Sequence, residues 1–304
     1  MTAAWVLIGY AGVIGFVAPR LLLRSSWPYR APALALAAWL ALSASFTVTV
    51  ALAAHRLAAP TEHFHAGVIG LLHSCGLTAD PVTTDDPAVA ARLAVTLPAV
   101  VVLLLLSSFA FEVLRGLRLR SRHRRVLDLV GRRSSWLRAT VLDHERPAAY
   151  CLPGHRPRVV VSAGAMRLLS AAQLDAVLAH EHAHIAGRHH LVLAASQAFA
   201  RVFGPLPLAR HGREQTAVLL EMIADDRALR RQPRQVLAAA MYDMAAGSAP
   251  AGAFAVGGPS ALTRLRRVLA PQRRPHAALR SAVAAAVVAA PSAPLLMGCL
   301  HGLG

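Results

Sequence analysis

Long uncharged stretches divide the chain, and they predict a membrane protein built mainly of helices. The four stretches that are nearly free of charge are 3–18, 31–54, 93–111 and 281–300. Because a membrane-spanning helix needs about 20 apolar residues, each stretch is expected to form one span. Pro291 and Pro294 interrupt the last stretch, which makes it the least regular. The first is expected to remain uncleaved, since Arg20 and Arg24 follow it and no basic segment precedes it.

The polar region between the third and fourth stretches shows strand and helix patterns instead. Short apolar runs bounded by turn residues predict strands at 137–142, 148–152 and 158–161. Pro153 and Gly154 predict a turn between the last two strands. Ser170 and Gln173 form a capping-box pattern that starts a helix, and Gly187 is expected to end it. This region is therefore predicted to be a mainly helical α+β domain with a small β-sheet.

Three parts of the chain follow from these patterns. We expect three transmembrane helices in 1–112 with an outer loop near 55–91, the α+β domain in 113–275, and a fourth transmembrane helix with a short outer tail in 276–304. The stretch 191–208 is also apolar, but a span there would separate the two halves of the domain across the membrane. It is expected to be a buried or membrane-apposed helix instead.

Charge gives this architecture an orientation. Hydrophobic residues make up 56% of the chain and charged residues only 15%, yet the formal net charge is +17. Arginines cluster between the first two stretches, after the third and before the fourth, whereas 55–91 is mainly acidic. Since short cytoplasmic loops collect basic residues, the domain is expected in the cytoplasm and both termini outside. Arginines beside spans meet anionic lipid, so no direct nucleic-acid binding is expected.

Residues 180–184 (His-Glu-His-Ala-His) carry the most specific chemical motif of the chain. They spell HExxH, in which His180 and His184 lie one helical turn apart on one face and can bind one zinc ion. Glu181 beside them is the expected general base. A pair of surface histidines on an amphipathic helix is the alternative, and a third ligand decides between the two. The neighbouring histidines expected to be surface residues and not ligands are His182, His189 and His190.

Glu221 is the best candidate for a third ligand. It lies in a helical pattern that runs over about 213–230. Catalytic zinc sites usually have three protein ligands and one open position, so this carboxylate would complete the set. Asp225 lies one turn after Glu221, where it could accept the free ring N–H of a zinc-binding histidine. The alternative for both acids is an ordinary solvated helix face.

Three segments carry a resemblance to a known group: 157–162 (PRVVVS), 173–184 (QLDAVLAHEHAH) and 221–225 (EMIAD). With the flanking spans they resemble membrane zinc peptidases of the BlaR/MecR antibiotic-sensor type, and more distantly HtpX-like and CAAX prenyl peptidases. The resemblance implies a multi-pass membrane protein with a gluzincin-like HExxH domain and one Zn2+ per chain. It assigns His180, His184 and Glu221 as ligands, Glu181 as base and a winged-helix repressor as substrate. The sensors continue into an external penicillin-binding domain that this sequence lacks, so β-lactam sensing is not expected.

The leading functional hypothesis is a membrane-anchored zinc endopeptidase that cleaves a cytoplasmic or membrane-associated protein, in regulated proteolysis of a repressor. The alternatives are an HtpX-like quality-control protease and a non-catalytic zinc-containing signalling scaffold. Structural zinc usually has four protein ligands, often cysteines, and Cys151 is the only cysteine expected in the cytoplasm. A strand near the HExxH helix could bind a substrate peptide as an added strand, or could be a plain structural hairpin.

The other two cysteines are expected on the outer side. Cys75 lies in the predicted outer loop and Cys299 at the outer end of the fourth span, in an oxidising compartment. A disulfide between them would tie the loop to the C-terminal tail. Two unpaired thiols are the alternative.

Overall fold

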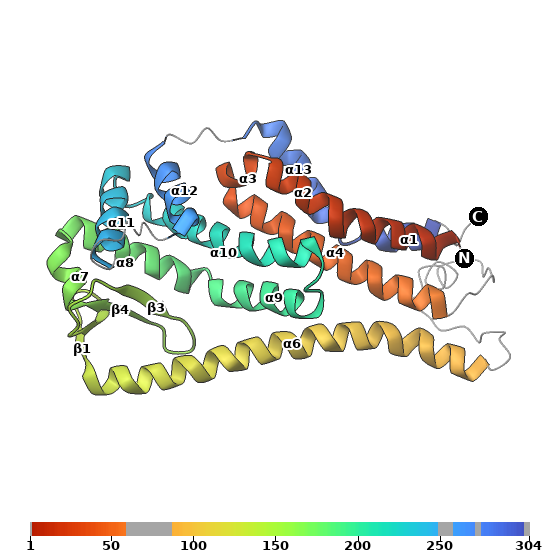
Figure 1. Cartoon of the computed structure of the whole chain (residues 1–304), viewed down its shortest axis with the longest axis horizontal. Coiled ribbons are helices and arrows are strands. Elements are labelled where there is room, and N and C mark those ends of the chain that lie inside the picture. The colour runs from red at the N-terminus through yellow and green to blue at the C-terminus, as the bar shows by residue number, and fades with distance from the viewer. Residues whose placement is uncertain (1, 59–86, 249–257, 271–274, 301–304) are drawn as a thin grey trace.

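The computed structural model describes residues 2–58, 87–248, 258–270 and 275–300. Long helices extend to one end of the molecule, where both chain ends lie, and a mixed domain with a small sheet forms the other end (Figure 1). Cys75 and the side chain of Cys299 fall outside the described residues, so their disulfide stays a prediction. Most of the expected outer loop, 59–86, does so as well.

Two apolar helical segments begin the chain. The first consists of α1 (Thr2–Gly12), a π-helical turn (Val13–Val17) and α2 (Ala18–Arg24), which follow one another directly. The second is α4 (Pro32–Ala58), which the short α3 (Trp27–Arg30) precedes. With 92–130 they are the three described helices long and apolar enough to cross a membrane. The first three predicted helices are therefore confirmed, and their insertion in a bilayer stays a prediction.

The helix predicted over 281–300 is not continuous. The structure has α13 (Ala277–Ala289) and α14 (Ala293–Leu300), with a turn between them. Pro291 lies in that turn, and proline interrupts a helix because it has no N–H and its ring clashes with the preceding turn. The expected fourth transmembrane helix is therefore two shorter helices, interrupted as its prolines indicated, and its insertion in a bilayer stays a prediction. Both pieces pack against α4.

Helix α6 (Pro87–Val130) joins the apolar part of the molecule to the domain. Its 44 residues span about 66 Å at the usual rise of an α-helix. The predicted span at 93–111 is its first half, and the helix continues through residue 112 without a break. The domain is therefore attached to the third apolar helix by a stiff element instead of a loop.

The sheet has the strand order β1-β2-β4-β3. Its strands are β1 (Gly131–Ser134), β2 (Ala139–Leu142), β3 (Ala149–Leu152) and β4 (Arg158–Ser162). β2 and β4 are parallel, and the other two pairs are antiparallel. The three predicted strands are confirmed, as is the turn at Gly154, which has a φ of 138°. β1 was missed because its Gly-Arg-Arg-Ser sequence has no apolar alternation.

The two faces of the sheet pack against different helices. On one face, Leu127 of α6 contacts Leu152 and Val160. On the other, Val159 and Val161 belong to a core shared with α7 (Ala163–Leu168) and α8 (Ala171–Ala186). The edge strand β3 lies next to α8. This places one open sheet edge beside the helix that contains the HExxH motif.

Four further helices complete the domain: α9 (His189–Val202), α10 (Pro207–Ala228), α11 (Arg234–Ser248) and α12 (Gly258–Leu269). As predicted, most of the apolar stretch 191–208 forms a packed helix, α9, which ends at Val202 and lies against α6 and α10. Trp39 and Phe46 of α4 share a core with Leu208 and Leu219 of α10. The domain and the apolar helices are therefore packed together around α10.

Gly164 provides a test of how closely α7 approaches the segment that connects β2 and β3. A Cβ atom there would lie 1.8 Å from the backbone oxygen of Glu145, and backbone cannot move aside as a side chain can. We expect Gly164→Ala to destabilise the protein by about 1–3 kcal/mol, measured by thermal unfolding in detergent. Gly212→Ala is the matched control, because its Cβ would make an ordinary 3.6 Å contact with Trp39. Equal melting temperatures for the two variants would contradict this packing.

Candidate metal centre

Helix α8 fixes the relative position of His180 and His184. It starts with the predicted capping box, in which the Ser170 hydroxyl accepts from the Gln173 N–H and the Gln173 side chain accepts from the Ser170 N–H. Four residues of helix then bring the two imidazole rings to one face, with centroids 4.8 Å apart. Their Nε2 atoms are 3.1 Å apart. The helix therefore holds the two Nε2 atoms close enough to bind one metal ion.

Glu221 on α10 completes the cluster. Its Oε1 lies 3.3 Å from Nε2 of His184 and its Oε2 lies 3.4 Å from Nε2 of His180. The possible ligand atoms of the three residues all lie within 4.8 Å of one another. A tetrahedral zinc ion with bonds near 2.1 Å holds its ligand atoms about 3.4 Å apart. The donor types and their spacing therefore fit a zinc ion.

Asp225 lies behind His180, one turn after Glu221. Its carboxylate is fully buried, and its Oδ1 accepts a hydrogen bond of 3.0 Å from Nδ1 of His180. Burial works against its charge, but hydrogen bonds from Arg264 and His180 outweigh that effect and lower its pKa to about 2. Asp225 thus lies where it can accept the ring N–H of His180, and the Nε2 of His180 is left free for a metal.

Arg264 on α12 was not identified from the sequence as a site residue. Its guanidinium donates to both Asp225 oxygens at 2.9 and 2.8 Å, and its Nη1 lies 2.8 Å from Oε2 of Glu221. In the sequence it belongs to an arginine-rich segment attributed to membrane topology. Its partners lie about forty residues away in the chain, so no local pattern could indicate the contact. Against the effect of burial, Arg264 together with His180 lowers the pKa of the partly exposed Glu221 and of the buried Asp225, which favours the ionised form of both.

His189 lies behind His184, and its position differs from the one predicted from the sequence. It was predicted to be a surface residue, yet it is only 4% exposed and its Nδ1 lies 2.8 Å from Nδ1 of His184. Arg188 adopts a left-handed conformation (φ 49°) that turns the chain back beneath α8. A Cβ on Gly187 would come within 2.4 Å of the His189 ring, so this close approach needs glycine.

The tautomers follow from this arrangement. If Nε2 of His184 faces a metal, its Nδ1 carries the proton and donates to Nδ1 of His189. Burial and the neighbouring His184 lower the pKa of His189 to about 4, which keeps this ring neutral and able to accept. The other two histidines of this segment lie outside the cluster: His182 is exposed, as predicted, and His190 is half-buried.

Glu181 follows His180 on α8, and its carboxylate interacts with the edge strand β3. Burial raises its pKa, which suits a group that must accept and release a proton near neutral pH. The thiol of Cys151 on β3 interacts with the Glu181 carboxylate, and burial together with that negative charge raises the pKa of the thiol to about 12. Cys151 is therefore a neutral neighbour of the expected base.

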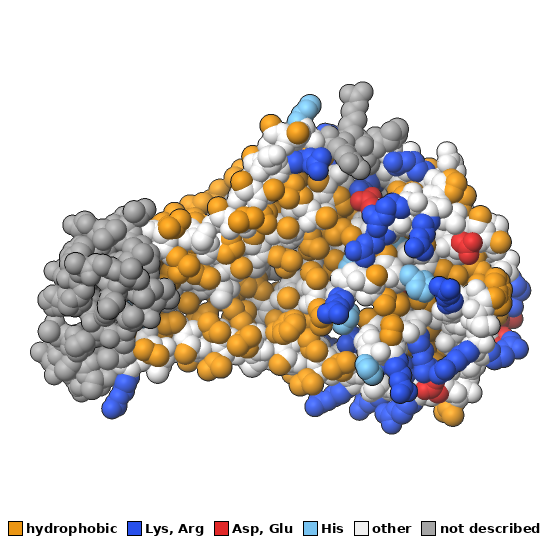
Figure 2. Space-filling view, turned by 180° about the vertical axis from the view of Figure 1, so that it is seen from behind, with side chains coloured by type: hydrophobic (Ala, Val, Ile, Leu, Met, Phe, Trp, Pro, Cys, Tyr) orange, Lys and Arg blue, Asp and Glu red, His pale blue; other side chains and the backbone are white. Residues whose placement is uncertain are grey.

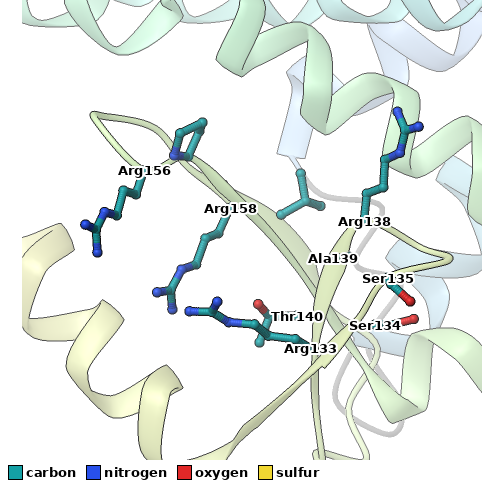
Figure 3. Close-up of a pocket in the computed structure, with 10 residues that line it drawn as sticks. Arg133, Ser134, Ser135, Arg138, Ala139, Thr140, Arg156 and Arg158 are labelled. Atoms are coloured by element: carbon teal, nitrogen blue, oxygen red, sulfur yellow. The ribbon is translucent and has the colours of Figure 1, made fainter.

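A separate basic pocket of about 640 Å³ opens beside β1, β2 and β4 (Figure 3). Arg133 and Arg158 extend toward each other there, and both pair with Asp128 at 3.7 and 2.5 Å. None of the lining residues belongs to the histidine cluster. The pocket is therefore separate from the candidate metal centre.

Comparison with known proteins found one family model that is similar to the central part of the chain. Residues 114–230 match the model of Peptidase family M48. This segment contains α8 and α10, and so His180, Glu181, His184, Glu221 and Asp225. The match supports a metallopeptidase of the M48 type and does not single out the BlaR/MecR subtype. No curated protein and no solved structure matches the chain.

The contact between His189 and His184 leads to a testable prediction. His189→Leu removes the acceptor for Nδ1 of His184, so we expect zinc affinity to fall about 10-fold or more. The affinity can be measured by competition with a chromogenic chelator. His182→Leu serves as the control, since His182 is exposed and bonds only to its own helix. Unchanged zinc affinity in His189→Leu would show that His189 does not orient the ligand.

Proposed function

We propose that this chain is a membrane-anchored zinc endopeptidase that hydrolyses peptide bonds of a cytoplasmic or membrane-associated protein. The observation that supports it most is the convergence of His180, His184 and Glu221, within 4.8 Å, inside a segment that matches Peptidase family M48. M48 peptidases are typically zinc-dependent. The same three residues would hold one Zn2+ per chain, and the fourth position would remain for water.

The roles of the protein groups follow from their positions. His180, His184 and Glu221 would hold the zinc ion, which would supply polarisation of the scissile carbonyl and a lowered pKa for a water molecule. Glu181 accepts a proton from that water and later gives it to the departing amine, for which its raised pKa is suitable. Asp225 and His189 hold the two ligand rings in place. Arg264 balances the charge of Glu221 and Asp225.

The substrate peptide is proposed to bind along β3. Among the described residues this strand pairs only with β4, so its other edge can accept main-chain hydrogen bonds from an extended peptide. The contact between Cys151 and Glu181 puts this edge next to the base. Binding through backbone groups would give little side-chain selectivity, and it suits an enzyme that cleaves within a protein chain.

The membrane arrangement is supported by the distribution of side chains. Apolar side chains cover the narrow part of the molecule, whereas most arginines gather on the broad end (Figure 2). Exposed leucines of α6 such as Leu103 and Leu106 are 62% and 59% exposed, and lipid would cover them. The arginine-rich domain is therefore proposed to lie on the cytoplasmic side, with both termini outside.

The choice of substrate rests on the resemblance alone. A winged-helix repressor fits a BlaR/MecR-like protease, and membrane proteins fit an HtpX-like one. A non-catalytic zinc scaffold is less well supported, because structural zinc usually has four protein ligands. The cluster has three, and the nearby Cys151 contacts Glu181 instead of joining them.

Two substitutions distinguish the proposed base, Glu181, from the proposed zinc ligand, Glu221. We expect Glu181→Gln to retain one zinc per chain while casein hydrolysis falls by about two to four orders of magnitude, because it removes the proton acceptor only. Glu221→Ala should lose zinc as well as activity. Metal content is measured by atomic absorption and hydrolysis by fluorescence release. Full casein hydrolysis by purified Glu181→Gln would rule out the proposed mechanism.

Topology can be read with fused reporters. We expect a reporter placed after Arg125 to behave as cytoplasmic and one inserted near Thr84 as external, because arginines flank the cytoplasmic ends of spans. Paired alkaline phosphatase and green fluorescent protein fusions make the measurement. High phosphatase activity after Arg125 would overturn the orientation, and a cytoplasmic repressor could then no longer be the substrate.

A further inference from the structure

Helix α12 holds two consecutive carboxylates of α10 with two arginines one turn apart. Arg264 pairs with Asp225, which lies behind the candidate metal centre. Arg267 pairs with both oxygens of Asp226, at 2.8 Å each. Paired guanidinium–carboxylate contacts fix orientation as well as distance. The two contacts therefore hold α12 against α10 in one register.

Arg267 also reaches a third element. Its Nε donates a hydrogen bond of 2.6 Å to the backbone oxygen of Tyr29, in the short helix α3 that connects the first two apolar segments. The last carbonyls of a helix have no partner within it, and an arginine can satisfy one. Arg267 is 7% exposed. This contact is therefore a buried link between the apolar helices and the domain.

Helix α12 connects this buried contact of Arg267 to the candidate metal centre. Arg264 and Arg267 are three residues apart on one rigid helix, so a movement of α3 that shifts Arg267 also shifts Arg264. The Nη1 of Arg264 lies 2.8 Å from Oε2 of Glu221, the oxygen that also faces His180 at 3.4 Å. A shift of Arg264 would therefore change the charge balance at Glu221, one of the proposed metal ligands.

We propose that Arg267 is a positioning residue that couples the first two apolar helices to the metal centre, acting through α12 and Arg264. This inference rests on the proposed zinc-peptidase function and adds a route for its regulation. A change in the tilt or spacing of the first two helices alters the charge balance around Glu221. The signal that such a protein would receive is a mechanical one, from the bilayer or from a partner in it.

The test uses the full chain in lipid nanodiscs and measures zinc release to a chromogenic chelator. We expect Arg267→Gln to release zinc about tenfold faster than the unmodified protein. Arg266→Gln is the matched control, since Arg266 is exposed on the same helix and loses the same charge. Asp226→Asn should also speed release, because it breaks the paired contact with Arg267 while the Tyr29 contact remains. Equal release from Arg267→Gln and Arg266→Gln would overturn the proposal.

Bilayer thickness separates coupling from simple loosening of α12. Zinc release from the unmodified protein should differ between dimyristoyl- and dioleoylphosphatidylcholine discs, because hydrophobic mismatch changes helix tilt. In Arg267→Gln the release should be faster but equal in both lipids. A lipid effect that persists in Arg267→Gln would mean that another path carries the signal, and the absence of any lipid effect in the unmodified protein would equally contradict the coupling.

A metal-independent measurement distinguishes this inference from the proposed function. Hydrogen–deuterium exchange of the metal-free protein should show faster exchange in α12 in Arg267→Gln than in Arg266→Gln, and lipid-dependent exchange in α12 only when Arg267 is present. If the unmodified protein binds no zinc but passes this test, the zinc-peptidase proposal fails while the link between helices holds. If it binds zinc and fails this test, the link alone is refuted.

Discussion

The buried carboxylate of Asp225 is the constraint on which the rest of the candidate site depends. A charge with no exposure to solvent needs compensation, and Arg264 and His180 supply it from two different helices. Satisfying Asp225 fixes the ring of His180, brings α12 against α10 and places a guanidinium beside Glu221. The metal centre is thus one part of a larger charge network, and zinc would enter a site whose ligands are already oriented.

Helix α10 contributes both to the candidate metal centre and to the hydrophobic core shared with α4. Its inner face supplies Glu221 and Asp225, while Leu219 and Leu220 pack with Trp39 and Phe46 of α4. The apolar helix α4 and the candidate metal centre therefore both contact α10. Together with the stiff connection through α6, this packing leaves little freedom between the apolar helices and the domain. A movement of the apolar helices would therefore be transmitted to the candidate metal centre.

Sequence reasoning succeeded where the determinants are local. The capping box at Ser170, the stop at Gly187 and the spacing of His180 and His184 all lie within one helix, and helical geometry follows from them. It failed where a contact joins distant segments, as for Arg264, or where a left-handed residue redirects the chain, as for His189 after Arg188. The break at Pro291 was also indicated locally, because a proline cannot continue a helix, but the sequence did not show that the stretch would form two separate helices.

The central claim is that His180, His184 and Glu221 bind one zinc ion. X-ray absorption spectroscopy at the zinc edge of the loaded full-length protein tests it most directly. We expect one zinc per chain with two imidazole nitrogens, carboxylate and water oxygens at about 2.0–2.2 Å, and no sulfur. The Glu221→Ala protein should lose this signal. A sulfur shell near 2.3 Å, or a full complement of zinc in Glu221→Ala with unchanged spectra, would contradict it.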